Sequence, residues 1–135
     1  MKKFIFVLRS LLRAMFKSLR SGSIKQGYLF PAQMFARFAQ KPLTPHDYEA
    51  IIAHNIKDAW VNVAYRAAAL AGRELSAGEY QYMREHAINN GSVALAEHIA
   101  NMSGQALTSS ELKTLAHNCY SEAGLKRAAF NMLRT

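Results

Sequence analysis

The sequence predicts an all-α protein in which a basic N-terminal arm precedes three helical hairpins stacked as a short solenoid. Three observations predict this fold. Before residue 47 the chain has basic but no acidic residues, and its apolar side chains recur at helical spacing. The rest of the chain repeats one pattern at an interval of 32 residues. Only three prolines and seven glycines interrupt the 135 residues, which favours helices over a many-stranded sheet.

The arm, residues 1–42, is predicted to contain two helices. Over residues 3–20, apolar side chains fall on one face of a helix that turns about 100° per residue. They are Phe4, Leu8, Leu11, Leu12, Met15, Phe16 and Leu19. The sequence Ser21-Gly22-Ser23 is expected to end this helix. Pro31 is expected to begin a second short helix that runs to Gln40.

The positive charge of the chain is concentrated in this arm. The formal net charge is +8, and nine basic residues precede the first acidic one, Asp47. The remainder has eight basic and nine acidic residues and is therefore nearly neutral. Four cations fall together on the face opposite the apolar stripe: Arg9, Arg13, Lys17 and Arg20. We expect these four to meet an anionic membrane or an acidic partner.

Three main roles for the arm stay open. Its apolar stripe can pack on the first hairpin as the cap that a solenoid needs, which is the role we favour. It can lie in an anionic membrane surface, because cations opposite Phe and Leu are typical of an interfacial helix. It can also be a targeting segment, because a basic, acid-free amphipathic stretch is typical of a mitochondrial presequence. Contact with nucleic acid is the least favoured role.

Three repeats are predicted, at residues 43–74, 75–106 and 107–135. Each begins with Leu, then Thr or Ser, and has Asp or Glu three residues after the hydroxyl. The three sets are Leu43-Thr44 with Asp47, Leu75-Ser76 with Glu79, and Leu107-Thr108 with Glu111. This spacing is that of a capping box, in which hydroxyl and carboxylate both accept from backbone N–H groups at a helix start. Asp47 is the weakest match, because the box usually has Glu or Gln.

Each repeat is predicted to fold as two helices joined by a tight turn. In the first repeat the helices are expected near 44–57 and 60–71. Small residues recur at three places: the turn (Ala59, Gly91, Ala123), the second helix (Ala64, Ala96, Ala128) and the helix end (Gly72, Gly104). Glycine is the residue expected just after a helix C-terminus, and the alanines suit a close approach of the two helices.

This pattern resembles the tetratricopeptide and pentatricopeptide repeat superfamily. In the second repeat Tyr80, Gly91, Ala96 and Met102 resemble the aromatic, glycine, alanine and methionine marks of a pentatricopeptide unit, with the methionine one residue early. The unit is shorter than in either family, and no proline ends its second helix. The resemblance covers residues 43–135 and implies a helical hairpin rather than a particular ligand.

The resemblance also raises RNA binding, because pentatricopeptide-type repeats read single-stranded RNA about one base per repeat. The family's base-contacting position, two residues after the aromatic mark, is occupied here by Ala50, Tyr82 and Thr114. Thr114 has the polar character of that position, and Tyr82 can stack on a base. The nearly neutral repeats lack the basic groove that phosphate binding needs. RNA binding by the arm and the first helices is therefore the alternative function.

No catalytic constellation, metal site or cofactor is predicted. The repeat-equivalent carboxylates are explained as caps, and His54, His86 and His117 are spaced about one repeat apart rather than as ligands of one ion. The chain has no glycine-rich phosphate loop and no Cys-x-x-Cys. Cys119 is expected to be a small buried hydrophobe. Trp60 is expected to be a packing anchor between the arm and the first repeat.

The sequence thus predicts a non-enzymatic interaction module, a small subunit or adaptor of a larger, membrane-attached assembly. First-helix residues used neither in caps nor in the core are the expected partner contacts: His54, Tyr82, His86 and Asn118. No small-molecule substrate is indicated. A single cysteine fits an intracellular, reducing compartment. Peripheral attachment to a membrane, or a mitochondrial location as the alternative, follows from the role of the arm.

Overall fold

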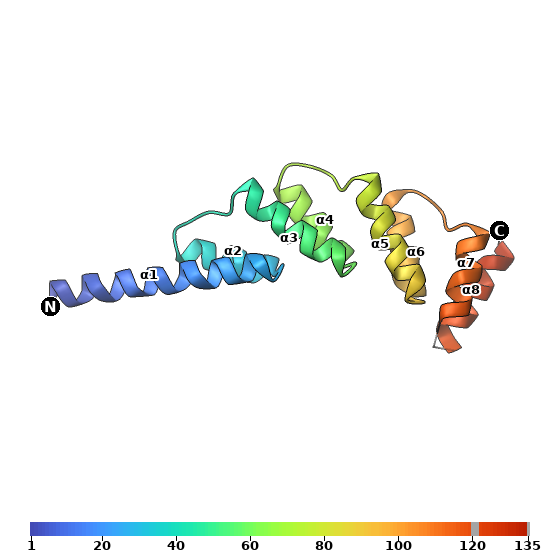
Figure 1. Cartoon of the computed structure of the whole chain (residues 1–135), viewed down its shortest axis with the longest axis horizontal. Coiled ribbons are helices and arrows are strands. Elements are labelled where there is room, and N and C mark those ends of the chain that lie inside the picture. Colours follow the sequence, from blue (N-terminus) through green and yellow to red (C-terminus); the bar gives the residue numbers. More distant parts are fainter. Residues whose placement is uncertain (120–121, 135) are drawn as a thin grey trace. The chain divides into compact units, whose positions relative to one another are not determined.

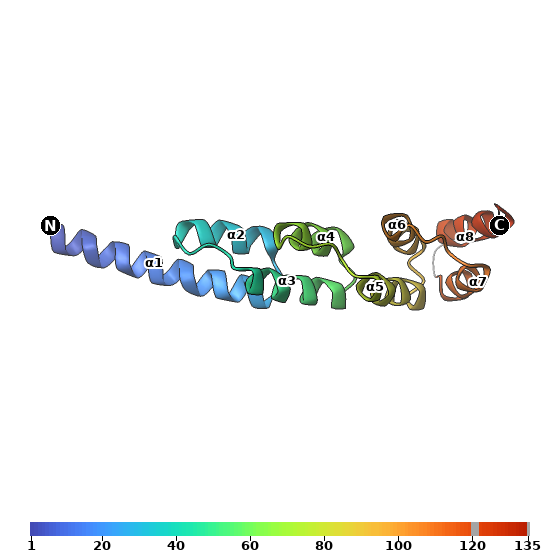
Figure 2. The same ribbon diagram turned by 90° about the horizontal axis from the view of Figure 1, so that it is seen from above.

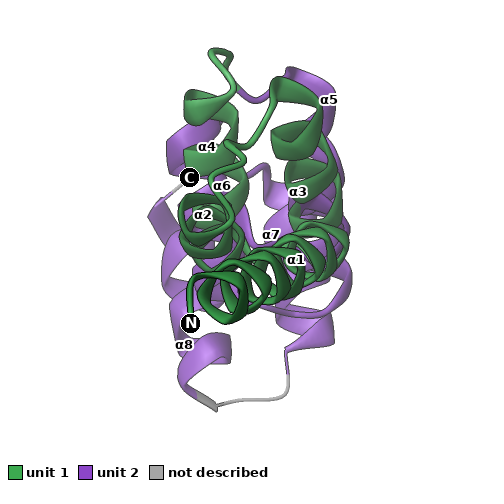
Figure 3. Ribbon diagram, turned by 90° about the vertical axis from the view of Figure 1, so that its left-hand side faces the viewer, with its two compact units in different colours: residues 1–55, 62–74 green, residues 56–61, 75–135 purple. Residues whose placement is uncertain are grey.

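The computed structural model describes residues 1–119 and 122–134. This part contains eight helices and no strand, which confirms the all-α class. The helices are α1 (Lys2–Lys25), α2 (Leu29–Phe38), α3 (Pro45–Lys57), α4 (Val61–Leu70), α5 (Ala77–Asn89), α6 (Val93–Ser103), α7 (Ser109–Asn118) and α8 (Glu122–Arg134). The chain forms two compact units, residues 1–55 with 62–74 and residues 56–61 with 75–135, and each is described by itself (Figure 3).

The first unit is built from two helix pairs, α1 with α2 and most of α3 with α4. Within this unit α1 and α3 form one row and α2 and α4 the other (Figure 2). Phe16 of α1 stacks on Phe35 and Phe38 of α2, with ring centroids 6.2 and 5.1 Å apart. Arg66 of α4 lies over the ring of Phe30 in α2, 5.3 Å from its centroid. Aromatic side chains of α2 therefore contact the helices on both sides of it.

The second unit has the same construction. α5 packs against α6 and α7, while α8 packs against α6 and α7. Within this unit α5 and α7 form one row and α6 and α8 the other (Figure 2). Glu97 of α6 accepts from Arg127 of α8 at 2.6 Å and also from Asn131. Second helices are thus linked to each other, as first helices are.

All three predicted capping boxes are present. Ser76 with Glu79 starts α5, and Thr108 with Glu111 starts α7. Asp47, the weakest match in the sequence, also completes its box: its carboxylate accepts from the Thr44 N–H at 2.9 Å, and the Thr44 hydroxyl accepts from the Asp47 N–H at 3.1 Å. Each box satisfies backbone N–H groups that a helix start would otherwise leave unpaired.

Left-handed backbone conformations recur every 32 residues up to Gly104. The turns within the first three helix pairs contain Gly27, Ala59 and Gly91, with φ of 74°, 56° and 67°. The second helices of these pairs are followed by Gln40, Gly72 and Gly104, with φ of 53°, 83° and 72°. The predicted turns at Ala59 and Gly91 and the predicted helix ends at Gly72 and Gly104 are therefore confirmed. Gly27 and Gln40 show the same geometry in residues 1–42.

Buried small residues recur at the same interval. Four alanines on the second helices are fully buried, with 0% exposure: Ala32, Ala64, Ala96 and Ala128. Three of them are the alanines predicted from the repeat, and they are buried as a close approach of two helices would require. The fourth lies in α2, outside the predicted repeats. Three residues earlier in each of the first three pairs, a branched apolar residue is also buried: Leu29, Val61 and Val93. α1 and α2 therefore share the turn geometry and the burial register of the repeats.

The helices of the arm differ from the predicted ones. α1 runs through Ser21-Gly22-Ser23 to Lys25, so the predicted break there is wrong. A glycine inside a helix costs about 1 kcal/mol, and burial of Ser23 and Ile24 offsets that cost. α2 spans Leu29–Phe38 rather than starting at Pro31. Pro31 is the third residue of that helix, where the missing N–H would have no partner within the helix.

Three local predictions were also wrong. α8 begins at Glu122, so Ala123 lies within this helix and not at a turn. Cys119 follows the end of α7 and is partly exposed rather than buried. Trp60 is 64% exposed, because its neighbours Ala59 and Val61 occupy the buried positions at this turn.

Candidate interaction surfaces

An arginine of α1 holds the start of the next helix pair in the first unit. The Arg20 side chain is 5% exposed, and its Nε donates to the Lys41 carbonyl at 2.9 Å. Its Nη2 donates to the Pro42 carbonyl at 2.9 Å and to Asp47 Oδ2 at 2.5 Å. Since Asp47 also caps α3, one carboxylate serves both the helix start and the arginine. We call this arrangement the arginine clasp.

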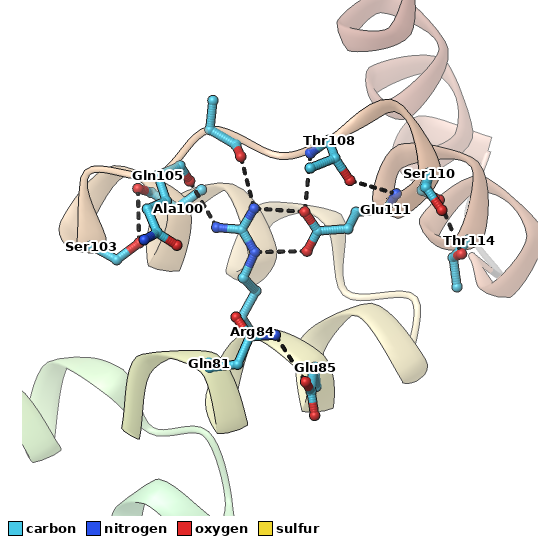
Figure 4. A network of polar contacts seen from close by, with 11 residues as sticks. Gln81, Arg84, Glu85, Ala100, Ser103, Gln105, Thr108, Ser110, Glu111 and Thr114 are labelled. Atoms are coloured by element: carbon cyan, nitrogen blue, oxygen red, sulfur yellow. Dashed lines mark hydrogen bonds and ion pairs between the residues drawn. The ribbon is translucent and has the colours of Figure 1, made fainter. Parts of the chain in front are cut away.

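The second unit contains the same clasp around Arg84 of α5 (Figure 4). Its guanidinium donates to both carboxylate oxygens of Glu111, each at 2.7 Å. It also donates to the carbonyls of Gln105 at 2.7 Å and Ala106 at 2.8 Å. The Arg84 side chain is 6% exposed and that of Glu111 is 22% exposed. Such a bidentate pair is strong because two charge-assisted bonds form in a fixed geometry.

The two clasps have the same spacing along the chain. In both, the acceptors lie 21, 22 and 27 residues after the arginine. Arg20 was predicted to lie on an open cationic face, and this prediction was wrong, because it is buried at 4% exposure. Arg13 is exposed but donates to Gln40 Oε1 at 3.0 Å. Arg9 and Lys17 are exposed, as predicted.

The clasps shift the pKa values of their carboxylates. The hydrogen bond from Arg84 is the largest cause that lowers the pKa of Glu111, from 4.5 to about 2, and it outweighs the opposing effect of burial. The same hydrogen bond raises the pKa of Arg84. Burial by itself raises the pKa of Asp47, but hydrogen bonds from Thr44 and the charge of Arg20 lower it overall. These shifted groups hold helix pairs together.

We expect the Arg84 clasp to make stability depend on pH below about 5. The folded pKa of Glu111 is depressed, so its contribution is present above the unfolded pKa near 4.5 and is lost as the pH falls towards 2. The loss is about 3 kcal/mol. Urea unfolding across this range should show Glu111→Gln to be less stable at neutral pH and flatter in acid than the unmodified chain. Parallel acid profiles for the two proteins would contradict this expectation.

A polar groove of about 550 Å³ lies between α5 and α7 beside the Arg84 clasp. Six polar residues besides those of the clasp contribute to its lining: Gln81, Glu85, Asn89, Thr108, Ser110 and Thr114. Arg84 and Glu111 neutralise each other, so the carboxylate of Glu85 gives the groove a negative formal charge. Glu85 Oε1 accepts from Gln81 Nε2 at 2.8 Å, which fixes both side chains on the exposed face of α5.

Two of the predicted partner contacts are used in packing instead. Asn118 Nδ2 donates to the Ile88 carbonyl at 3.2 Å, and the Asn118 carbonyl lies against the turn at Gly91. At the turn of Gly27 the neighbour is the His54 side chain, so close that a Cβ on that glycine would be 2.8 Å from the imidazole ring. Each residue sits at the end of a first helix and contacts the turn of the preceding pair. Neither is brought to the groove.

The other two predicted partner contacts, Tyr82 and His86, differ in exposure. Tyr82 is 50% exposed and His86 is half-buried, both on α5, but neither lines the groove. Of the two predicted RNA contacts, Thr114 lines the groove and Tyr82 does not. Gln81 and Glu85 were missed. Their spacing of four residues on a predicted helix was the signal that would have placed them on one face.

The apolar stripe of α1 is exposed except at Phe16, which stacks on α2. Exposure is 71% for Phe4, 46% for Leu8, 63% for Leu11, 47% for Met15 and 41% for Leu19. The expectation that this stripe packs on the first hairpin as a cap was therefore wrong. The buried face of α1 instead carries Arg20, Ser23 and Ile24. The hydrogen bonds of Arg20 hold this face of α1 against the rest of the first unit. Most of the apolar stripe lies on a different face of the helix.

Comparison with known proteins adds no relative. No protein family model matches the chain, and neither a curated protein nor a solved structure matches it. The likeness to tetratricopeptide and pentatricopeptide repeats therefore stays a prediction. Within residues 1–119 and 122–134, no three His, Cys, Asp or Glu side chains form a group that could hold a metal ion. No helix in that part combines the length and the apolar content needed to cross a membrane.

Proposed function

We propose that this chain is a non-enzymatic interaction module that binds a protein partner within a larger assembly. The observation that carries the proposal is the clasp that recurs, with identical spacing, in both units. If the same stacking rule applies along the whole chain, four helix pairs form a short solenoid of tetratricopeptide or pentatricopeptide type. Such stacks bind partners on extended surfaces formed by neighbouring repeats, and the row of first helices is the surface we propose here.

The groove between α5 and α7 is the partner surface we propose. Gln81, Asn89 and Thr114 offer hydrogen-bonding groups there, and Glu85 supplies a negative charge. This chemistry suits a protein segment that carries amide or basic side chains. It disfavours RNA, because phosphates need cations and the cation of this groove, Arg84, is paired with Glu111.

The perturbed side chains also favour a binding role over a catalytic one. Strongly shifted pKa values mark candidates for acid–base chemistry, but structural ion-pair networks also produce them. Here Glu111 and Asp47 each cap a helix and pair with a clasp arginine. Protonation of either would loosen a junction between helix pairs, so their shifts are explained by folding.

Site-specific photo-crosslinking in the native cell tests this proposal. A photoreactive residue at Gln81 or at Glu85 should yield a discrete adduct with one protein. The same residue at Ala94, an exposed position on α6, is the matched control and should not. Adducts of equal yield at all three positions, or recovery of the chain only as a lone monomer, would contradict the proposal.

A further inference from the structure

We propose that the N-terminal half of α1 binds an anionic membrane surface and lies in the interface with its apolar face inserted. This proposal goes beyond the binding of a protein partner and does not depend on it. The segment concerned is the α1 overhang, residues 2–12. Three features of α1 support the proposal: its length, the exposure of its apolar residues and its charge.

The overhang is the part of α1 by which this helix exceeds the length of other first helices. α1 has 24 residues, whereas the first helices α3 and α5 have 13 each, a difference of eleven. The overhang accordingly extends beyond α2 (Figure 1). Every residue from 1 to 15 is exposed, whereas Arg20, Ser23 and Ile24 near the other end are buried. No other element of the first unit covers the overhang.

The exposed apolar surface of the overhang is unusually large. Phe4 and Phe6 are 71% and 72% exposed, and Leu11 is 63% exposed. At about 100° per residue, the apolar side chains other than Phe6 cover about half the circumference of the helix. The same face continues through Met15 and Leu19, which are also exposed. A continuous apolar patch of this kind marks an interaction site.

The positive charge of the overhang indicates which kind of surface its apolar face binds. Lys2, Lys3 and Arg9 lie within it, and the chain has no acidic residue before Asp47. On the helical projection Lys3 and Arg9 lie at the two edges of the apolar face. Long cationic side chains at those edges can reach lipid phosphates while the apolar face is inserted. Anionic lipid therefore complements both the charge and the shape of this helix.

A second copy of the chain is a poorer occupant. Two apolar faces in contact would bring the edge cations of both copies together, with no carboxylate on either helix to neutralise them. Repulsion between like charges would oppose such a dimer. A membrane avoids this repulsion because its headgroups carry the opposite charge.

Vesicle co-sedimentation of the full chain tests the proposal. The probes are vesicles of phosphatidylcholine containing about a third phosphatidylglycerol, and vesicles of phosphatidylcholine alone. We expect binding to the anionic vesicles only. The double variant Lys3→Glu/Arg9→Glu should bind them at least about tenfold more weakly, since each cation strengthens binding about fivefold. The control Lys57→Glu changes an exposed cation of α3 and should bind as the unmodified chain does.

The apolar face is tested by Leu8→Asp/Leu11→Asp, which should abolish binding. Its control is Leu70→Asp, at a position in α4 that is 46% exposed. All substituted side chains are exposed, so urea unfolding should show the stability of the packed helices unchanged. Insertion itself is read from Phe4→Trp in a Trp60→Phe background, whose single tryptophan should be quenched by brominated acyl chains.

Two results would overturn the proposal. One is equal binding to neutral and anionic vesicles that Lys3→Glu/Arg9→Glu does not change. The other is a concentration-dependent dimer, measured by sedimentation without vesicles, that Leu8→Asp/Leu11→Asp converts to monomer. That second result would assign the apolar face to another copy of the chain.

Discussion

Replacing Arg84 by Ala should destabilise the protein by about 3 kcal/mol. The substitution removes four hydrogen bonds, two of them to Glu111. It leaves the Glu111 carboxylate, 22% exposed, without its cation, and two loop carbonyls without their donor. Removing one partner of a largely buried ion pair is costly because the other charge stays desolvated. Urea unfolding followed by circular dichroism measures the loss.

Arg73→Ala is the matched control for this prediction. Arg73 also pairs with a carboxylate, Glu49, at 2.6 Å, but the two side chains are 33% and 46% exposed. Exposed pairs contribute little, so the expected loss is below about 1 kcal/mol. Adding Glu111→Gln to Arg84→Ala should recover part of the first loss, because the unpaired charge is then removed. Equal losses for Arg73→Ala and Arg84→Ala would contradict the structural role of the clasp.

Gly91→Ala should also cost about 3 kcal/mol. Gly91 has a φ of 67°, a conformation that residues with a Cβ adopt at a cost of about 1 kcal/mol. A Cβ there would also lie 2.1 Å from the carbonyl oxygen of Asn118 and 2.8 Å from the N of Cys119. These are backbone atoms, so no rotamer change relieves the clash. The end of α7 would have to move away from the turn.

Gly104→Ala separates the cost of the left-handed backbone conformation from the cost of the clash with neighbouring backbone atoms. Gly104 has a φ of 72°, but a Cβ there would meet nothing within 4 Å. Only the conformational cost of about 1 kcal/mol is expected. Thermal or urea unfolding of the two variants measures the difference between their losses of unfolding free energy, and this difference is due to the close packing at Gly91. If both lose the same free energy, the contact between the Gly91 turn and α7 does not matter for stability.

Much of the repeat could be predicted from the sequence because local chemistry determines it. Capping boxes and C-terminal glycines depend on residues within a few positions of each other, so Ser76 with Glu79 and Gly104 could be read directly. Even Asp47, a poor match, formed its box. The buried alanines followed from the interval alone, because position in a helical register decides burial.

The clasps could not be predicted in the same way. Arg20 joins a helix to a loop and a cap 21 to 27 residues later, and no local rule predicts such a partner. Arg20 was therefore predicted to lie on the solvent-exposed face of the helix together with Arg13. The available signal was the interval of 64 residues between Arg20 and Arg84, which is twice the repeat. Gly27 and Gly91 share that interval.

The extent of the repeat was missed for a related reason. The Leu-Thr/Ser capping box marks the start of the three predicted units, and residues 11–16 have no such box because α1 does not begin there. α1 instead extends towards the N-terminus as the overhang. Leu29 and Ala32 match Val61 and Ala64 at the repeat interval and would have extended the alignment to α2. This match is hard to recognise in the sequence, because the most regular apolar spacing in α1 belongs to its exposed face and not to its buried face.

Native-state amide hydrogen exchange of the full chain tests most directly whether α1 has two parts, a clasped helix of the first pair and an unpacked overhang. Helices shorter than about 12 to 15 residues are marginal in water, so the amides of residues 3–12 should exchange much faster than those of residues 16–24. Anionic vesicles should slow the first group and leave the second unchanged. Equal protection of both groups without vesicles would show that the overhang is packed, and would contradict this account.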